Sequence, residues 1–262
     1  KRRWFSAKGK PISAPPGPTS SQLLPGRWSS AAALGLLGPA AQHNITGSII
    51  YGLIDGEIGY LNVRSLWWRR IPDLDDTLDK ALALFQRARM VIVDVSVNGG
   101  GGEGLGMRVV ERFAGARTLG FYKYAGDGRD EKPQPIFVVP SKKARFLGPA
   151  YVITSGETFS AAETLAMSMS VLPNVVHLGQ PTAGALSDVL SRRLPNGWRV
   201  GLSNEIYLDV ARKSWEGIGV PPTVGLEIRP DLKTASPGDL KAARAVLNAI
   251  IARAKSKATG RD

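Results

Sequence analysis

The pattern of hydrophobic and polar positions becomes regular at about residue 48 and from there predicts strands and helices in alternation. Two β-rich stretches in GSIIYGLIDGEIGYLNV are separated by Asp55-Gly56, a dipeptide typical of a hairpin turn. Between Asp73 and Arg89, leucine and alanine recur at helical spacing and acidic residues precede basic ones, which predicts an amphipathic helix. The apolar run MVIVDVSV ends at glycines and indicates a buried parallel strand.

The rest of the chain continues this alternation. Helices are predicted over GEGLGMRVVERFA, over Phe159–Leu172 up to Pro173, and over about residues 237–254. The short runs IFVVP, AYVITS and VVHLG predict strands, and SRRLPNGWRVGLSNEIYLDV predicts a hairpin that turns at Pro195-Asn196-Gly197. Strands that alternate with helices in this way predict the α/β class, with a mixed, partly parallel sheet flanked by helices.

Composition divides the chain into three parts. Residues 6–40 are rich in proline, serine, glycine and alanine, so residues 1–44 are expected to be a flexible or loosely docked basic leader, or the remnant of an upstream subdomain. Residues 45–235 hold the regular pattern and are expected to be the core, followed by a C-terminal helix and basic tail over residues 236–262. Because the chain begins with Lys1, we expect a processed chain or a fragment, with any export signal upstream.

The formal net charge of +12 would suggest nucleic-acid binding if it were spread over the chain. Residues 1–40 carry +6 and residues 252–262 carry +3, which leaves only +3 on everything between them. Basic flanks are usually solvated tails, and the sequence has no zinc finger or groove-reading helix, so no nucleic-acid partner is expected. No apolar run is long enough to predict an integral membrane segment, and nothing in the sequence indicates an oligomeric state.

The stretch Val91–Gly104, VIVDVSVNGGGGEG, joins a buried strand to consecutive glycines. Glycines let backbone N–H groups point into a cavity unobstructed, so this loop is suited to bind a phosphate or an oxyanion. A P-loop is excluded because its lysine is absent, and a dinucleotide-binding pattern that begins at Gly102 has Met107 at its third glycine position. The alternative that the residues leave open is a flexible strand-to-helix turn.

The stretch Ala150–Met167 is expected to form a strand, a tight turn and a helix. Ser160 lies near the start of that helix, where the helix dipole and unpaired N–H groups favour a developing negative charge, so Ser160 is a candidate nucleophile. The alternative is that Ser160 is only the N-cap, because Ser160 and Glu163 have the spacing of a capping box. Ser155 and Thr158 are rival hydroxyls.

Six stretches in the same order resemble segments of the C-terminal processing (tail-specific) serine peptidases, and together they span about residues 49–232. They are DGEIGYLNVRS, VIVDVSVNGGG, TSGETFSAAE, LGQPTAG, LPNGWRVGLSNEIYLD and WEGIGVPPTVGLEI. Each motif is weak by itself, but six of them in the right order are specific. The resemblance favours the nucleophile interpretation of Ser160, which is compatible with an N-cap position.

The resemblance implies a crotonase/ClpP-like α/β core that hydrolyses peptide bonds in unfolded or C-terminal segments of a polypeptide, through an acyl-enzyme on Ser160. It implies that the backbone N–H groups of Gly99, Gly100 and Ala161 bind the oxyanion. The residues expected to contact substrate are Asn98, which would also hold the loop's shape, Thr182 and Gly184. No cofactor and no metal are expected, in keeping with zero cysteines and two histidines. The location that the resemblance implies is periplasmic or secreted.

The general base departs from the family pattern. In the bacterial processing branch a lysine follows the TxG turn, whereas this chain has Ala185 there, so it resembles the branch of the tricorn core and the retinoid-binding proteins. That branch uses a histidine assisted by a serine and a glutamate, which makes Glu216 the expected assisting carboxylate and His43 a candidate base. His177 is expected to be a half-buried strand residue. The alternatives are a base upstream of Lys1, and a catalytically inactive peptide- or ligand-binding protein of the same fold.

The run Trp67-Trp68-Arg69-Arg70 has two interpretations. It lines a substrate groove or partner surface, or it anchors the end of a strand on the core. Asp94, just before the glycine loop, is expected either to orient that loop or to cap the end of its strand.

Overall fold

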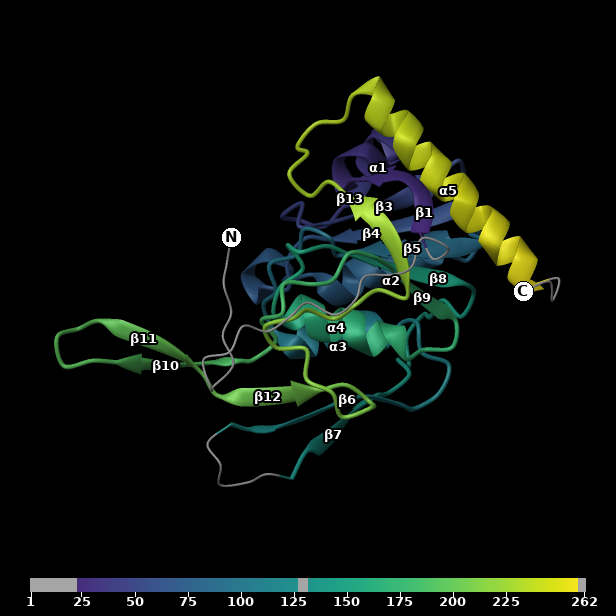
Figure 1. Ribbon diagram of the computed structural model, residues 1–262. Coiled ribbons are helices and arrows are strands. Elements are labelled where there is room, and N and C mark those ends of the chain that lie inside the picture. Colours follow the sequence, from purple (N-terminus) through teal and green to yellow (C-terminus); the bar gives the residue numbers. More distant parts are fainter. Residues whose placement is uncertain (1–22, 127–131, 259–262) are drawn as a thin grey trace.

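The computed structural model describes residues 23–126 and 132–258, which form an α/β fold around a large sheet (Figure 1). The described strands of this sheet lie in the order β1-β13-β9-β8-β5-β4-β3-β2. Neighbouring strands from β1 to β4 are parallel, and the pairs β4–β3 and β3–β2 are antiparallel. Their bounds are β1 Leu23–Trp28, β2 Gln42–His43, β3 Ile49–Ile54, β4 Ile58–Val63, β5 Met90–Asp94, β8 Ala150–Thr154, β9 Val175–Gly179 and β13 Val224–Ile228. The predicted α/β class with a mixed, partly parallel sheet is confirmed.

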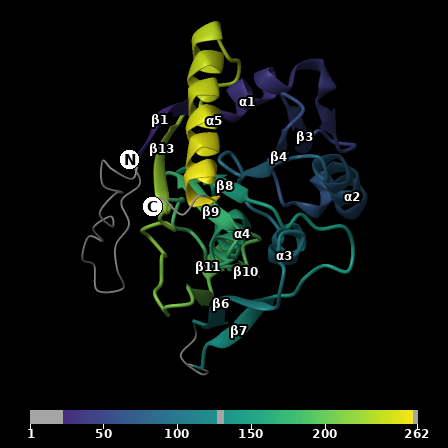
Figure 2. The ribbon, with the colours of Figure 1, turned by 90° about the vertical axis from the view of Figure 1, so that its right-hand side faces the viewer.

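Helices cover both faces of this sheet (Figure 2). One face carries α2 (Leu74–Phe85), α3 (Glu103–Val110) and α4 (Ala161–Ser170), and the other carries α1 (Ser30–Leu37) and α5 (Pro237–Ala258). The central strands require two covers because their apolar residues point to both sides. In β5, Val91 and Val93 join the core on the α2–α4 face, and Met90 and Ile92 join the core on the α1–α5 face. In the described ranges, no helix has the length and apolarity needed to cross a bilayer.

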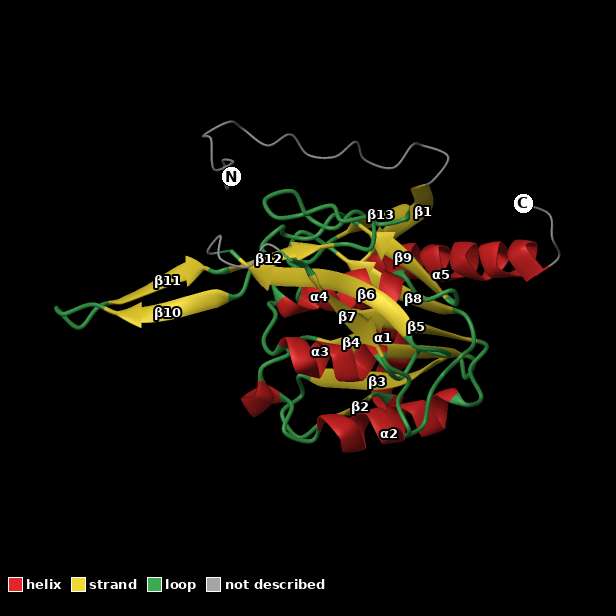
Figure 3. Cartoon of the chain, turned by 90° about the horizontal axis from the view of Figure 1, so that it is seen from below, coloured by secondary structure: helices red, strands yellow, loops and turns green. Residues whose placement is uncertain are grey.

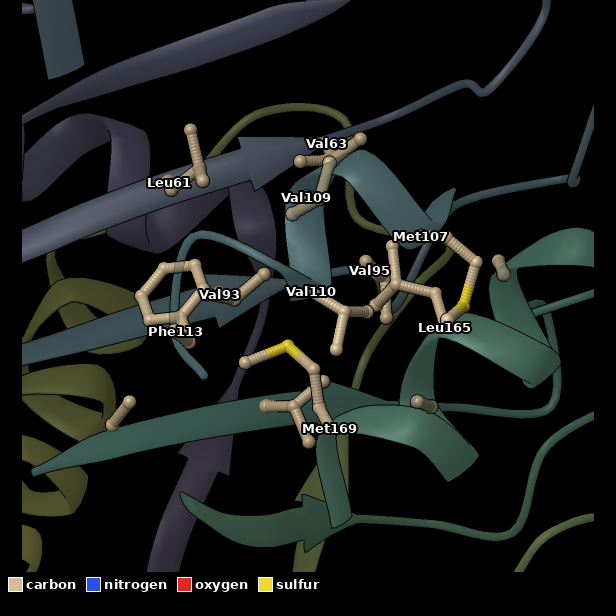
Figure 4. Packing of buried hydrophobic residues seen from close by; sticks show 14 of the residues in the cluster. Leu61, Val63, Val93, Val95, Met107, Val109, Val110, Phe113, Leu165 and Met169 are labelled. Atoms are coloured by element: carbon tan, nitrogen blue, oxygen red, sulfur yellow. The ribbon is translucent and has the colours of Figure 1, made fainter. Parts of the chain in front are cut away.

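The core between the sheet and helices α3 and α4 fixes the elements that lead to the glycine loop (Figure 4). Val93 and Val95 gather there with Val110 of α3 and Met169 of α4, and all four side chains are fully buried. Because α3 and α4 both pack on β5, the loop that follows β5 and the start of α4 are held side by side.

Two smaller strand assemblies complete the fold. A three-stranded sheet of order β12-β6-β7 contacts α4 through β6, and it consists of β6 (Thr118–Ala125), β7 (Gln134–Val138) and β12 (Glu205–Leu208). The predicted hairpin near residue 196 is formed by β10 (Val189–Arg193) and β11 (Arg199–Ser203), and it projects away from the rest of the chain (Figure 3). The three-stranded sheet was not foreseen as a unit, because β6 was not among the predicted strands.

The predicted hairpin at Asp55-Gly56 is confirmed. Strands β3 and β4 pair on either side of it, and Asp55 and Gly56 have φ of 54° and 72°. Two successive positive φ values are what a type I′ turn requires, and the aspartate–glycine pair suits that turn.

The structure places the chain from Leu23 on inside the fold, which differs from the loosely docked leader expected up to residue 44. Strand β1 lies at the edge of the large sheet beside β13, and its register shifts between Leu23 and Arg27. Trp28 is fully buried and its Nε1 donates to Asp94 Oδ2 at 2.8 Å. The Pro-Gly in LLPGRW hides this strand from pattern analysis, because an edge position tolerates a proline that a central strand excludes. Residues 1–22 of the expected leader lie outside the described residues.

Candidate active site

Ser160 is the residue at which the loop after β8 turns into α4. Its backbone has φ 57° and ψ −125°, a conformation that residues other than glycine rarely adopt. The rival hydroxyls are buried and bonded, since Ser155 Oγ donates to Ser96 O and Thr158 Oγ1 donates to Val95 O. Ser160 instead lines a cavity, so it is the hydroxyl of the three that a substrate reaches.

The glycine loop after β5 lies directly against Ser160. A Cβ added at Gly100 would come within 2.8 Å of Ser160 Cβ and 2.6 Å of Phe159 O, and Gly100 has φ of 87°. Phe159 N also donates to Asn98 O at 3.0 Å, which joins the two loops through the backbone. Glycine at position 100 is therefore required both by the close approach and by the backbone conformation.

Two backbone N–H groups near Ser160 have no acceptor among the described residues, and one of them, that of Ala161, belongs to a residue that lines the cavity. No hydrogen bond between described residues uses the amide of Gly99 or that of Ala161. Ala161 is also the first residue of α4, where the helix dipole favours negative charge. The predicted third donor, Gly100, has to be removed from the set, because its N–H already donates to Asn98 Oδ1 at 2.8 Å. Gly99 and Ala161 are the donors that this arrangement offers.

Asn98 is placed to shape the glycine loop. Its side chain is fully buried, donates through Nδ2 to Val63 O at 2.8 Å and accepts from Gly100 N through Oδ1. Both ends of the amide are thus used inside the protein, and Asn98 is not among the residues that line the cavity at Ser160. The expected contact with substrate is replaced by an internal one.

Glu163 ties Ser160 to the turn that follows β9. Its buried carboxylate accepts hydrogen bonds from Ser160 N (3.1 Å), Thr182 Oγ1 (2.5 Å), Gly184 N (2.8 Å) and Ala185 N (2.8 Å). Burial raises the pKa of Glu163, although these four donors act against the rise. Thr182 and Gly184 were expected to bind substrate, but both are buried and bonded to Glu163, so they support Ser160 from behind.

Glu216 holds the segment after this turn. Its Oε2 accepts from Leu186 N at 2.9 Å and from Ser187 N at 3.0 Å. Burial raises the pKa of Glu216, and the two backbone donors oppose that shift. Leu186 lines the cavity at Ser160, so Glu216 shapes one wall of it.

The fold does not bring His43 to Ser160. His43 on β2 pairs with Ile50 of β3. The row of paired residues that begins with these two crosses β4 and β5 and ends at Ile153 of β8, the strand that leads to Ser160. Four strand spacings therefore separate the edge strand from β8, and at about 4.8 Å each they amount to roughly 19 Å. A general base has to lie within hydrogen-bond reach of the nucleophile, which this placement does not provide.

His177 is buried inside β9, more deeply than the half-buried position expected from the sequence. Its Nε2 lies 2.7 Å from Thr154 Oγ1 and its Nδ1 lies 3.2 Å from Ser170 Oγ. Burial lowers the pKa of His177 to about 3, so the ring stays neutral. Both ring nitrogens are occupied, and His177 serves the packing between the sheet and α4.

A cavity of about 140 Å³ opens at Ser160 and Ala161, and charged residues line it. Lys123 Nζ lies 3.1 Å from Glu103 Oε1 and 3.5 Å from Glu205 Oε2. Burial alone lowers the pKa of Lys123, but the charges of Glu103 and Glu205 outweigh it and raise that pKa. Lys123 is therefore a cation at neutral pH and a poor acceptor for the Ser160 proton.

Sequence reasoning missed this charged wall. Lys123 lies on β6 and Tyr207 lies on β12, while Asp188 precedes the projecting hairpin. The Tyr207 OH donates to Glu205 Oε2 at 2.6 Å. The aromatic, β-prone segment GFYKYAG could have indicated the strand β6 from the sequence. Phe121 of this segment is buried, and Lys123, two residues later, lies on the same face of the strand.

Comparisons with known proteins point to one family. The model of peptidase family S41 matches residues 57–226, which is more than half of the chain. A comparison with curated protein sequences finds no significant match.

Among solved structures, the chain is similar to a candidate peptidase from Parabacteroides merdae, with a TM-score of 0.71 and 28% identity over 84% of this chain and 69% of that one. It is similar to mature CPAF complexed with lactacystin, with a TM-score of 0.63 and 14% identity over 75% of this chain and 52% of that one. For the photosystem II D1 C-terminal processing protease the TM-score is 0.54, with 22% identity over 71% of this chain and 45% of that one. The chain thus spans about half of the latter two proteins, and they show the fold alone. Together with the family match, the first structure supports a serine peptidase, and the chain belongs to peptidase family S41.

Proposed function

We propose that this chain is a serine peptidase that hydrolyses peptide bonds in unfolded or C-terminal segments of polypeptides through an acyl-enzyme on Ser160. The observation that carries the proposal is the conformation of Ser160, with φ of 57° at the N-terminus of α4, beside a cavity and two backbone amides that no described residue uses. Backbone strain of this kind is retained where the surrounding structure enforces it, as at functional sites.

The chemistry follows from this arrangement. Ser160 Oγ attacks the carbonyl carbon of the scissile bond, and its proton passes by way of a general base to the leaving amine. The amides of Gly99 and Ala161 face the oxyanion that forms, and the dipole of α4 stabilises the same charge. Collapse of the intermediate breaks the C–N bond and leaves an acyl group on Ser160, which water then hydrolyses.

A second candidate function is favoured by one observation. The described residues that line the cavity include no histidine, and their lysine, Lys123, is held as a cation by Glu103 and Glu205. A chain that places a serine at such a site without a neighbouring histidine or neutral lysine would bind peptides without cleaving them.

Labelling by a fluorophosphonate separates the two candidates. We expect the wild-type chain to be labelled at Ser160, as located by peptide mapping, and Ser160→Ala to remain unlabelled with an unchanged far-ultraviolet circular dichroism spectrum. Ser203→Ala is the matched control, because Ser203 is exposed on β11 and should leave labelling intact. A folded wild-type chain that takes up no label would overturn the peptidase proposal and leave the binding function, which predicts equal peptide affinity for the wild type and Ser160→Ala.

A further inference from the structure

A second cavity, of about 260 Å³, borders the same glycine loop. Val97, which precedes Asn98, forms part of its wall, and so does Ser65. The residue after Ser65, Leu66, donates to Gly100 O at 2.9 Å and accepts from Gly102 N at 2.8 Å. The wall of this cavity is thus one residue away from the backbone that packs against Ser160.

The second cavity is basic, and no carboxylate of the described residues lines it. Arg64 and Arg70 both border it, both are exposed, and no ion pair or side-chain hydrogen bond between described residues uses either guanidinium. Thr46, Ser48 and Ser65 complete the polar lining. The Thr46 hydroxyl already donates to Arg70 O and Ser48 Oγ, so among the described residues the hydroxyls of Ser48 and Ser65 are the ones left to donate. Two unpaired cations beside one cavity repel each other, and an anion between them removes that repulsion.

The acid that precedes α2, Asp73, is already bound elsewhere. Asp73 accepts from Asn44 Nδ2 at 3.0 Å through Oδ1, and from Ile45 N at 3.0 Å and Thr77 Oγ1 at 3.2 Å through Oδ2. Both oxygens hold the loop that carries Thr46 and Ser48, so Asp73 builds the rim of the cavity and does not line it.

We propose that this basic cavity is a subsite that holds a carboxylate of the peptide whose scissile bond lies at Ser160. The inference rests on the proposed peptidase function, because its ligand is the substrate itself. Arginine guanidinium groups with neighbouring hydroxyls are the donor set that binds a carboxylate through charge-assisted hydrogen bonds.

The two cavities select opposite charges along one bound peptide. The cavity at Ser160 is lined by Glu103 and Asp188 as well as Lys123, and the second oxygen of Glu103, Oε2, is buried without a partner among the described residues. A carboxylate is disfavoured there and favoured beside Arg64 and Arg70. A peptide is thereby oriented across the glycine loop, which places its carboxylate on the side away from Lys123.

The exposed tryptophans of the WWRR run flank this basic cavity. Trp67 is 60% exposed, its amide donates to Ser65 Oγ at 3.2 Å, and Trp68, 62% exposed, carries Arg69 over its ring. Large exposed aromatic groups next to a polar cavity are suited to contact the rest of a peptide. Their fluorescence also reports binding without requiring hydrolysis.

The test compares peptides of one sequence that end in a free carboxylate or in an amide, with one to five residues after the scissile bond. We expect kcat/KM to favour the carboxylate by about 10-fold or more at the best length, as charge-assisted hydrogen bonds allow. Arg64→Gln and Arg70→Gln should each lower this preference, and the double variant should bring it close to one. Arg69→Gln is the matched control, since Arg69 belongs to the same run but does not line the cavity.

Two further experiments identify the source of the carboxylate and distinguish failure of the subsite proposal from failure of the peptidase proposal. Amide-ended peptides with glutamate at successive positions show whether a side-chain carboxylate restores the preference, which would assign the subsite to acidic residues rather than to the C-terminus. The affinities of the carboxylate-ended and amide-ended peptides for the Ser160→Ala variant, measured by tryptophan fluorescence, give the same preference without catalysis. A carboxylate-to-amide preference near one for the wild type, or a preference that the double arginine variant leaves unchanged, overturns the subsite. Absence of fluorophosphonate labelling in the wild type, together with an intact preference in binding, overturns only the peptidase proposal.

Discussion

Two serines of this chain occupy the same formal position, the N-cap of a helix, and their backbones differ. Ser29 precedes α1 with φ −144° and ψ 148°, and its Oγ accepts from Ala32 N at 3.0 Å. Ser160 precedes α4 with φ 57° and ψ −125°. The first is the extended backbone that an N-cap residue normally adopts, and the second is a conformation that its surroundings have to enforce.

The contacts around the two serines explain the difference. Ser29 needs only its own helix, whereas Ser160 is held by Glu163 Oε1 on its amide, by Gly100 against its Cβ, and by the preceding residue's bond to Asn98 O. Two segments of the chain therefore converge on Ser160, its own helix through Glu163 and the glycine loop through Asn98 and Gly100. The bond from Ser160 N to Glu163 is that of a capping box, but a helix cap does not require the two contacts from the glycine loop. Those two contacts indicate that the orientation of Ser160 serves another purpose.

The largest effect is expected where the glycine loop touches Ser160. Gly100→Ala places a Cβ within 2.8 Å of Ser160 Cβ at a φ of 87°, so both overpacking and backbone strain oppose it. We expect the free energy of unfolding to fall by about 3 kcal/mol, together with loss of fluorophosphonate labelling. Urea denaturation and labelling measure the two effects.

Gly99→Ala is the matched control for this substitution. A Cβ at Gly99 meets nothing within 4 Å and its φ is not positive, while the backbone N–H is retained. Its stability should stay within about 0.5 kcal/mol of the wild type. Equal destabilisation by both substitutions would show that the contact at Gly100 does not hold Ser160.

A smaller effect is expected at Glu163, which bonds to Ser160 and to the turn after β9. Glu163→Gln keeps the shape of the side chain but turns an NH₂ group toward backbone donors, so at least one buried donor loses its acceptor. We expect a loss of roughly 2 kcal/mol in the free energy of unfolding at neutral pH, and slower labelling of Ser160. Glu227→Gln, on an exposed position of β13, should change neither quantity.

The pH dependence of stability gives an independent readout of Glu163. Burial raises its pKa above the ordinary 4.5, so the folded chain retains a proton that the unfolded chain has already lost. The stability from this group is complete below that ordinary value and is lost as the pH rises through the raised, folded pKa. The wild type should therefore lose stability relative to Glu163→Gln between these two pKa values. Parallel pH profiles for the two proteins would contradict the raised pKa.

The sequence predicted the sheet and the helices around it, because both depend on local patterns, and it singled out Ser160 as a candidate nucleophile. The run before Asn98 is apolar enough to indicate a buried strand, and Ser160 with Glu163 marks the start of a helix. The capping-box spacing, however, occurs at the strained serine and is absent after Ser29, where alanines follow. Local spacing therefore cannot separate a cap from a nucleophile, since the difference is made by residues far away in the sequence.

The walls of the site could not be predicted, for the same reason. Lys123 meets Glu103 across 20 positions of sequence, and Leu186 is bound by Glu216 across 30. Contacts of this kind depend on how β6, the glycine loop and the turn after β9 are brought together, and periodicity carries no information about that.

The smallest expected effect compares the two serines directly, through glycine substitutions that remove both the Cβ and the hydroxyl. At Ser29, glycine loses the bond from Ala32 N, and the free energy of unfolding should fall by a few tenths of a kcal/mol, or by about 1 kcal/mol for Ser29→Ala. At Ser160, glycine adopts φ of 57° without strain, so the free energy of unfolding of Ser160→Gly should rise by about 1 kcal/mol. Ser160→Ala keeps a Cβ in the strained conformation, so its free energy of unfolding should not rise. Opposite signs at two N-caps of one molecule, measured by urea denaturation, would show that strain is stored at Ser160. A loss of stability in Ser160→Gly similar to that in Ser29→Gly would mean that Ser160 is an ordinary helix cap.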